Sequence, residues 1–311
     1  MAEPTLTLKQ LRYLVAIADC RHFRQAAERC EISQPSLSVQ LRNLERLLGV
    51  QLVERGRSGV TLTPIGREVV ARSRRILLDA QGILDYSATA QHGLAGTIRL
   101  GVKPTLGPYL LPNVVRALHR RHRDLKLYIR EGAPHELGSE LSRGVHDLIL
   151  AQLPVRESAL ETARLFREPI YLALAADHPL AAQDDVSIQD LEGLPILSLA
   201  PDHHLHDQVL LLCEEFGAAL VRDYEGTSLD ALRQMVAMNM GATFFPALYV
   251  DSEVQRGGDV VTKQLRGRSI SRSIGLAWRQ GAGRAAAYLK VAAIIREVVR
   301  DDFKTVLQEV S

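Results

Sequence analysis

Cysteine and long apolar runs are both scarce in this sequence. Its 311 residues include three cysteines, Cys20, Cys30 and Cys213, which are too few for a disulfide framework and fit a reduced compartment. No apolar run approaches the roughly 20 residues that cross a bilayer. The N-terminus carries Glu3 and lacks the apolar core of a secretory signal. We therefore expect a cytoplasmic protein with no membrane partner.

The sequence also lacks the common motifs of enzymes and metal sites. It contains no GxSxG, no GxxxxGK[ST], no HExxH and no paired CxxC, so we expect neither catalysis nor a cofactor. Three of the ten histidines, His203, His204 and His206, fall within four residues. No clear carboxylate or thiolate beside them completes a tetrahedral ligand set. We therefore expect no metal site.

Positive charge is concentrated at one end of the chain. Residues 1–95 hold 13 Lys and Arg against 9 Asp and Glu, whereas the remainder holds 25 against 27. An excess of basic residues at the N-terminal end indicates a nucleic-acid-binding module there.

The first 50 residues predict three short amphipathic helices. Apolar residues recur at helical spacing after Leu11 and after Phe23. In the third helix Ser33 is a good N-cap, Pro35 suits the first turn, and Gly49 suits the end. The expected buried stripe of this third helix consists of Leu37, Leu41, Leu44 and Leu48.

The remaining faces of this third helix suit DNA. Its first turn and exposed side carry short polar side chains and arginine, which approach base edges and phosphates closely. Two extended runs then flank a basic hairpin, which reads as a wing, and Thr63-Pro64 opens another helix. We predict a winged helix-turn-helix in residues 1–64 that binds double-stranded promoter DNA. The alternative is the same fold with no DNA partner. The expected DNA-binding residues are Ser33, Gln34, Pro35, Ser36, Ser38, Val39, Arg42, Asn43, Arg55, Arg57 and Thr63.

Residues 65–92 predict a long helix with a seven-residue apolar repeat. Val69, Ile76 and Ile83 recur every seven residues, and each has an apolar neighbour one position on. Such a repeat favours a coiled-coil partner, so we expect a dimerisation helix. The alternative is a helix that packs only on its own domain.

The rest of the chain alternates apolar runs with helical stretches. The expected strands are 98–102, 127–130, 148–151, 170–175, 196–199, 242–245 and 274–278, and the expected helices are 108–121, 135–143, 205–216, 228–239, 247–254 and 284–306. This alternation predicts an α/β fold with parallel sheets and helices on both faces. Ligands bind such sheets at the carboxyl ends of strands, where helix N-termini lie. The expected effector-binding residues are Lys103, Pro104, Thr105, Pro201, His203, His204, Thr227, Ser228 and Phe245, of which Ser228 also reads as a helix cap.

The N-terminal stretch "FRQAAERCEISQPSLSVQLRNLERLLGVQLVERGRSGVTLTPIG" closely resembles the signature of LysR-type transcriptional regulators. Cys30 and Val53 stand where the family usually has leucine and phenylalanine. The resemblance implies a winged helix-turn-helix, a dimerising linker helix and a two-lobed, periplasmic-binding-protein-like effector domain over residues 93–311. It also implies a homodimer or homotetramer. We place lobe I at 97–166 and 271–306, and lobe II at 167–270.

The effector domain is most similar to the peroxide-sensing OxyR branch of this family. "GVKPTLGPYLLP", "TSLDALRQMVAMNMGATFFPAL" and "SIGLAWR" carry the resemblance. It implies a reactive cysteine at the position of His204 and a resolving cysteine at Cys213. It also makes His203 and Thr105 match polar residues of the sensor pocket, with Pro134 in place of a further threonine.

This chain therefore reads as an OxyR-like regulator that lacks the peroxide-reactive cysteine, because imidazole forms neither a sulfenic acid nor a disulfide. Leu210, Leu211 and Leu212 predict that the Cys213 thiol is buried and slow to react. We expect a small anionic or polar effector in the interlobe cleft. The alternatives are redox control through Cys213, or a solute-binding module with the same two-lobed fold.

Overall fold

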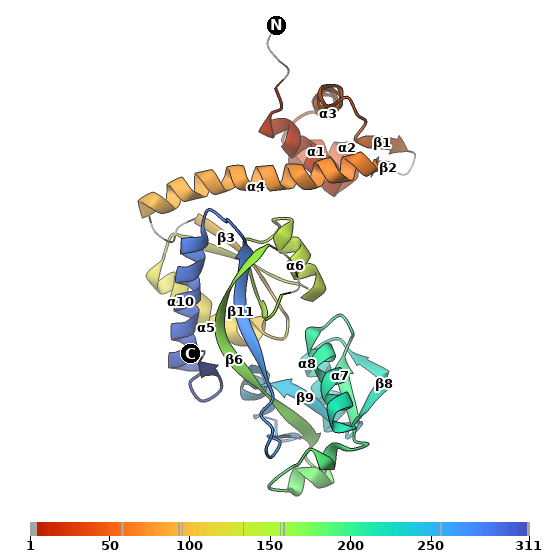
Figure 1. Cartoon of the computed structure of the whole chain (residues 1–311), viewed down its shortest axis with the longest axis vertical. Helices are drawn as coiled ribbons and strands as arrows, with labels where there is room; N and C mark the ends of the chain where they lie inside the picture. The colour runs from red at the N-terminus through yellow and green to blue at the C-terminus, as the bar shows by residue number, and fades with distance from the viewer. Residues whose placement is uncertain are drawn as a thin grey trace. The chain divides into compact units, whose positions relative to one another are not determined.

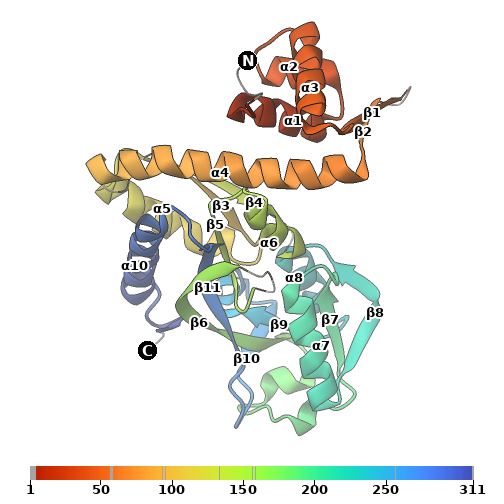
Figure 2. The same cartoon turned by 45° about the horizontal axis from the view of Figure 1, so that its top comes forward.

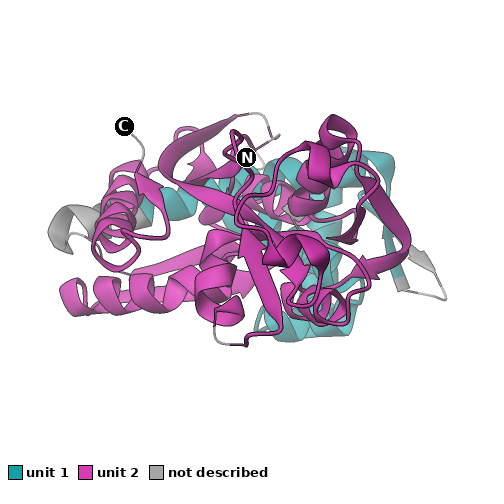
Figure 3. Cartoon of the chain, turned by 90° about the horizontal axis from the view of Figure 1, so that it is seen from below, with its two compact units in different colours: residues 1–87 teal, residues 88–311 magenta. Residues whose placement is uncertain are grey.

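The computed structural model describes residues 5–56, 59–92, 94, 96–132, 134–155, 157, 159–255 and 257–309. It forms two compact units, residues 1–87 and residues 88–311 (Figure 3). Within the described residues, no helix is long and apolar enough to cross a membrane. The prediction of an α/β effector domain behind a winged helix-turn-helix is confirmed.

The N-terminal unit consists of three helices, a two-stranded hairpin and most of a long helix (Figure 1). Thr7 and Gln10 form a reciprocal capping box at the first helix, and Gly49 ends the third in the left-handed conformation. Leu14, Ile17, Leu37 and Leu41 are buried together at the centre of the unit. Its elements are α1 (Leu8–Cys20), α2 (Phe23–Arg29), α3 (Gln34–Leu48), β1 (Val53–Gly56), β2 (Gly59–Leu62) and α4 (Pro64–His92).

A carboxylate fixes the hairpin to α3. Glu45 Oε1 accepts hydrogen bonds from the backbone N–H groups of Leu52 (2.8 Å) and Val53 (3.2 Å). Gly66 packs so closely on this segment that a Cβ there would meet the Leu52 carbonyl oxygen at 2.0 Å. These two contacts set the direction in which the chain leaves α3 and enters α4.

The second unit carries the remaining elements. The strands are β3 (Gly96–Val102), β4 (Leu125–Glu131), β5 (Leu148–Gln152), β6 (Leu160–Ala175), β7 (Pro195–Leu199), β8 (Ala219–Gly226), β9 (Thr243–Pro246), β10 (Val260–Lys263), β11 (Ser271–Arg279) and β12 (Gln308–Glu309). The helices are α5 (Gly107–Arg121), α6 (Pro134–Ser142), α7 (His204–Phe216), α8 (Leu229–Ala237), α9 (Ala247–Tyr249) and α10 (Ala285–Asp302). Two 3₁₀ turns, η1 (Pro179–Ala182) and η2 (Gln189–Leu191), and a π-helical turn, η3 (Val250–Val254), complete the unit.

The expectation of parallel sheets is correct for part of the unit and wrong for the rest. β3 pairs in parallel with β4 and β5, and β7 pairs in parallel with β8. β6 and β11 instead pair antiparallel to each other and to their other neighbours, in the order β10-β6-β11-β5-β3-β4. The sequence analysis also missed β8, β10, β12 and the first half of β6. β10 and β12 have four and two residues, too few to show a period of two, and β8 shows no regular alternation of buried and exposed residues.

β6 runs through both halves of the effector domain (Figure 2). Its first half pairs with β11 up to Pro169, and its second half pairs with β9 and β10 from Ile170 onward. Each half contributes to a different buried cluster, one around Ile98, Phe166 and Ile295 and the other around Leu174 and Phe244. The two lobes are therefore joined where β6 changes partners and where β11 begins.

An ion pair is buried at this junction. Arg272 Nε donates to Glu168 Oε2 at 2.8 Å, and the two side chains are 2% and 0% exposed. The second carboxylate oxygen of Glu168 accepts from the Leu248 N–H at 3.0 Å, at the start of α9. The Arg272 guanidinium also donates to Thr105, to the hydroxyl at 3.1 Å and to the carbonyl oxygen at 3.0 Å. Segments from four parts of the chain thus meet at one pair of charges.

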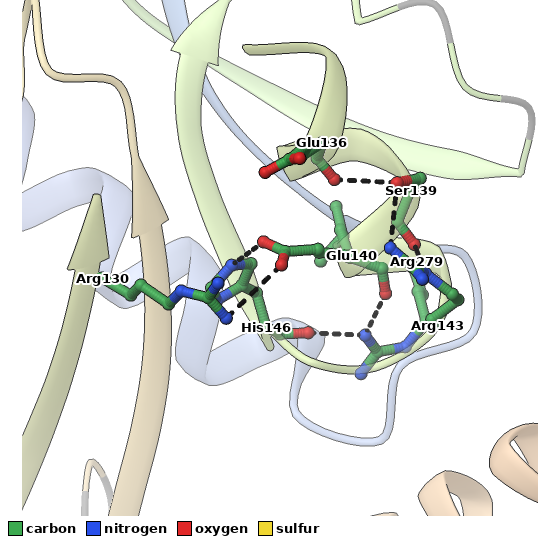
Figure 4. Close-up of polar contacts among 8 residues, drawn as sticks. Arg130, Glu136, Ser139, Glu140, Arg143, His146 and Arg279 are labelled. Carbon is green, nitrogen blue, oxygen red and sulfur yellow. Dashed lines mark hydrogen bonds and ion pairs between the residues drawn. The ribbon is translucent and has the colours of Figure 1, made fainter. Parts of the chain in front are cut away.

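A second polar cluster holds α6 against the sheet (Figure 4). Glu140 accepts from the buried ring of His146 (2.9 Å) and pairs with Arg130 (3.4 Å). Arg279 donates to the carbonyl oxygens of Leu141 (2.6 Å) and His146 (2.7 Å). Arg279 thus joins the end of α6, at Leu141, to the loop that follows it, at His146.

We expect Arg272→Met to lower the free energy of unfolding by about 3 to 5 kcal/mol, because the change leaves the Glu168 carboxylate buried and unpaired. Urea denaturation followed by circular dichroism measures this loss. The matched control is Arg268→Ala, which removes an exposed pair with Glu215 and should cost less than about 1 kcal/mol. Equal losses in the two variants would contradict the importance of the buried pair.

Candidate functional site

The predicted DNA-reading face of α3 is exposed. Gln34, Pro35, Ser36, Val39 and Arg42 are exposed, and Ser38 and Asn43 are half-buried. Among the described residues, no hydrogen bond or ion pair engages the Arg42 guanidinium. The helix thus presents a cation, amides and hydroxyls to solvent along one side.

The buried side of α3 differs from the prediction at one position. Leu37, Leu41 and Leu44 are buried, but Leu48 is 37% exposed because it lies in the last turn, beyond the packed part of the helix. Ser33 caps α3 as predicted: its hydroxyl oxygen accepts from the Ser36 N–H at 3.3 Å and lies 2.7 Å from the Ser36 hydroxyl. These two serines serve the helix start itself.

The predicted wing is a two-stranded hairpin. The backbone of Arg55 lies in β1, where it pairs with Val60, while Arg57 lies outside the described residues. Thr63 performs structural work, since its hydroxyl donates to Gln51 O (2.8 Å) and accepts from Gly66 N–H (2.9 Å) at the start of α4. The sequence analysis missed the positioning role of Glu45, although a lone acid among the leucines of α3 was a usable signal.

The apolar repeat of α4 divides into two parts. Val70 is 5% exposed and packs with Val69 against the core of the N-terminal unit. Ile76, Ile83 and Leu84 are 41%, 69% and 65% exposed. The first turns of α4 therefore pack on their own domain, and the later turns present an apolar stripe to solvent.

The residues after β3 form the first part of the predicted effector site. Lys103 is 4% exposed, and among the described residues its ammonium Nζ has no hydrogen-bond partner. The pKa of Lys103 is lowered to about 7, chiefly by burial and to a smaller extent by the Arg272 guanidinium, while Asp207 opposes the shift. Pro104 is half-buried, and Thr105 is engaged by Arg272. A buried amine without a partner is costly, so this position calls for a ligand or an ion.

The first turn of α7 forms the second part. His203 is the N-cap residue, and its side chain makes no capping hydrogen bond. Burial lowers the pKa of His203; Asp202 raises it, while nearby Lys103 and His206 lower it again. Lys103 and the start of α7 therefore lie close enough for their charges to influence each other.

The three histidines of this turn do not act as one group. The His206 ring bonds to Leu199 O at 2.8 Å, and the His203 ring lies 3.7 Å from Asp202. His204 is the first residue of α7 and is half-buried. In the portion that the structure describes, no three His, Cys, Asp or Glu side chains gather as a metal-binding group.

The other predicted effector residues are more scattered. Pro201 and Thr227 are exposed, and Ser228 caps α8 by accepting from Ala231 N–H at 3.1 Å. Phe245 is fully buried, with its ring centroid 4.9 Å from that of Tyr249. A ligand could touch Phe245 only if the ring moved out of the core of lobe II.

Cys213 lies on the buried side of α7. It is 4% exposed, and burial raises the pKa of its thiol to about 11, with a smaller effect from Glu214. The reactive form of cysteine is the thiolate, so this thiol reacts slowly at neutral pH. The expectation of a buried thiol is confirmed.

Sequence reasoning missed Glu168 and Arg272, which tie this site to the lobe junction. Glu168 follows Arg167 in β6, and Arg272 lies between two serines in β11, so neither stands out from its neighbours in the sequence. The two partners lie 104 positions apart in the chain, so spacing cannot identify the pair.

We expect the cost of burying Lys103 to depend on pH. The folded protein releases this proton near pH 7, whereas the unfolded chain holds it up to the ordinary value of 10.5. Between these values the unfolded chain binds more protons, so the free energy of unfolding rises with pH, by at most about 1.4 kcal/mol per unit.

Lys103→Met removes this dependence, so its stability gain over the unaltered protein should be largest below pH 7 and should shrink toward pH 10. Urea titrations across this range measure the difference, with Lys290→Met as the exposed control. A difference that does not change with pH would contradict the assignment.

Two family comparisons cover most of the chain. Residues 8–67 match the bacterial regulatory helix-turn-helix proteins of the lysR family, and residues 91–300 match the LysR substrate binding domain. The chain is 36% identical over 304 residues to the DNA-binding transcriptional dual regulator OxyR of Escherichia coli K12, covering 98% of this chain and 99% of the relative. It is 30% identical over 293 residues to the regulator EstR of Acinetobacter baylyi, covering 94% and 97%.

Solved structures agree with these matches. A full-length OxyR variant from Pseudomonas aeruginosa has a TM-score of 0.80 at 37% identity and covers 95% of this chain and 97% of its own. A Corynebacterium glutamicum OxyR variant with hydrogen peroxide bound has a TM-score of 0.66 at 32% identity and covers 96% and 94%. The named relatives are regulators and not enzymes, in agreement with the sequence prediction. The chain belongs to the LysR family of DNA-binding transcriptional regulators.

Proposed function

We propose that this regulator is switched by a small anionic effector that binds between the end of β3 and the start of α7. Lys103, Pro104, Thr105, Pro201, His203 and His204 contribute to the site, with Thr227, Ser228 and Phe245 at its periphery. Effector binding changes the closure of the two lobes and thereby the geometry with which the oligomer meets DNA.

The single observation that supports this site is the orphaned ammonium of Lys103. Its Nζ is buried without a partner among the described residues, and the neighbouring start of α7 has no side-chain cap. Unpaired N–H groups at a helix N-terminus and a buried cation both favour a negatively charged group. Gln208 of α7 donates to Ser271 O of β11 at 3.3 Å, so the start of this helix also touches the lobe junction.

We further propose a separate function for each of three segments of the chain. Residues 1–64 read promoter DNA through Ser33, Gln34, Pro35, Ser36, Ser38, Val39, Arg42 and Asn43, together with the wing residues Arg55, Arg57 and Thr63. Residues 65–92 pair two chains through the exposed stripe of α4, because two half-site contacts raise affinity and specificity. Residues 93–311 bind the effector, with lobes at 97–166 and 271–306 and at 167–270. The dimer or tetramer and the cytoplasmic setting remain predictions.

Redox control through Cys213 is the second candidate. The names of the relatives favour it, since several are hydrogen peroxide-inducible genes activators. The chemistry of this chain opposes it, because the thiol is buried with a raised pKa and because His204 stands where the resemblance implies the reactive cysteine. A single unreactive thiol does not make an intramolecular disulfide without a second cysteine nearby.

We expect Arg42→Ala to weaken binding to promoter DNA from upstream of the gene and to reduce the slope of log K against log salt by about 0.9, the share of one phosphate contact. Gel shifts at several salt concentrations measure both quantities. The matched control, Arg300→Ala in α10, should leave the slope unchanged. An unaltered slope in the Arg42 variant would refute its contact, and absence of binding at low salt would count against the DNA site.

We expect hydrogen peroxide to leave DNA bending and thermal stability unchanged in the protein and in Cys213→Ser. The reason is that the Cys213 thiol is largely protonated at neutral pH. A peroxide response that the serine variant abolishes would overturn the ligand-only proposal and support redox control. A strong response that survives the substitution would exclude the thiol as its origin.

A further inference from the structure

A hollow of about 230 Å³ lies behind the junction of the two lobes. Its walls come from β6, from the α9–η3 segment and from the end of β10 on the lobe II side, and from Thr305 and Val306 after α10. Figures 1 and 2 both show α7 and the C-terminal end on opposite sides of β6 and β11. The hollow shares no lining residue with the proposed site beside Lys103.

The lining of this hollow accepts hydrogen bonds and carries one negative charge. Asp251 supplies a carboxylate, Gln255 and Gln264 supply amides, and Thr262 and Thr305 supply hydroxyls. Thr262 is half-buried and the other four side chains are exposed, and none of the five has a hydrogen bond or ion pair to another described residue. Ala247 and Val250 add an apolar floor.

No positive charge lines the hollow in the described part of the chain. Lys263 stands between Thr262 and Gln264, but successive side chains of a strand point to opposite faces. Its ammonium donates instead to Gln183 O at 2.6 Å. An anion would therefore find no counter-ion here, whereas an organic cation would find a carboxylate and several acceptors. The volume is below the roughly 300–1,000 Å³ of sites for drug-sized ligands, so the ligand must be small.

The backbone beside the hollow contains a π-helical turn, and hydrogen bonds connect the preceding segment to Thr105. η3 is a π-helical turn, a feature found often at functional sites. The start of α9, one turn earlier, donates from Leu248 N–H to Glu168. Glu168 pairs with Arg272, which in turn holds Thr105, two positions from Lys103. Hydrogen bonds thus connect the α9 segment beside the hollow to Thr105, which follows Lys103 by two positions.

We propose that this hollow is a second ligand site, which binds a small organic ammonium ion against Asp251 and is coupled through Glu168 and Arg272 to the proposed effector site beside Lys103. A ligand in this hollow would contact residues of lobe II together with Thr305 and Val306 of lobe I. Its binding would therefore favour one arrangement of the two lobes over another. Binding of the ammonium ion in the hollow does not depend on whether the proposed effector site beside Lys103 binds an anion, since the two sites share no lining residue.

Titration of the full-length protein with 1,4-diaminobutane, followed by calorimetry, tests the site. We expect saturable binding that Asp251→Asn weakens at least tenfold. Glu253→Gln is the matched control, because this exposed acid of the same turn bonds to Ser252 and does not line the hollow. It should leave the affinity within twofold. Absence of saturable binding, or equal weakening in the two variants, would overturn the site, and binding of neutral sugars in place of the diamine would overturn its ligand class.

Hydrogen exchange tests the coupling. Saturating 1,4-diaminobutane should change the amide protection of residues 103–107 and 204–209, and the Asp251→Asn protein should show no such change at the same concentration. Unchanged protection in these segments despite binding would refute the coupling and leave the site intact. If the proposed effector site beside Lys103 failed to bind anions, neither the calorimetric result nor the hydrogen-exchange result would change.

Discussion

The effector domain depends on one buried ion pair at the place where its two lobes meet. Glu168 and Arg272 belong to the two strands that pass between the lobes, and each also bonds a segment from elsewhere, α9 for the glutamate and Thr105 for the arginine. Two charges inside a protein are tolerated only when their hydrogen bonds are satisfied. The pair therefore constrains several segments together, and a change in lobe arrangement that moved one of them would have to keep or replace these bonds.

Local rules of sequence were enough to predict the DNA-binding unit. Ser33, Pro35 and Gly49 marked the ends of α3, and Leu37, Leu41 and Leu44 marked its buried side, because caps and helical periodicity act within a few residues. The antiparallel course of β6 and β11 was not predicted, since strand pairing is decided by partners far away in the chain. In the candidate site, the positions of Lys103 and His203 were predicted, but the missing partner of the lysine was not. Whether an amine is satisfied depends on every segment packed around it.

Burying the ammonium form of Lys103 costs free energy for two reasons. Its environment contains the Arg272 guanidinium, and this like charge adds to the desolvation that lowers the lysine pKa. A core selected for stability alone would place an apolar residue there, as ordinary interiors do. Retention of an amine at this position is consistent with the proposed role, because stability lost in the empty protein is returned when an anion binds and the ammonium is paired.

The fold that this chain shares with its relatives depends on many residues, whereas the signal to which a regulator responds depends on few. The fold of a relative at 36% identity transfers because burial, caps and strand pairing are distributed over many residues. A signal depends on a few side chains, and here those beside the cleft are an amine and imidazoles, with one thiol that resists ionisation. Nitrogen groups bind and release protons and anions, whereas sulfur groups exchange electrons. For this reason we propose that the site between β3 and α7 responds to the charge of a ligand, although the relatives named for hydrogen peroxide share its scaffold.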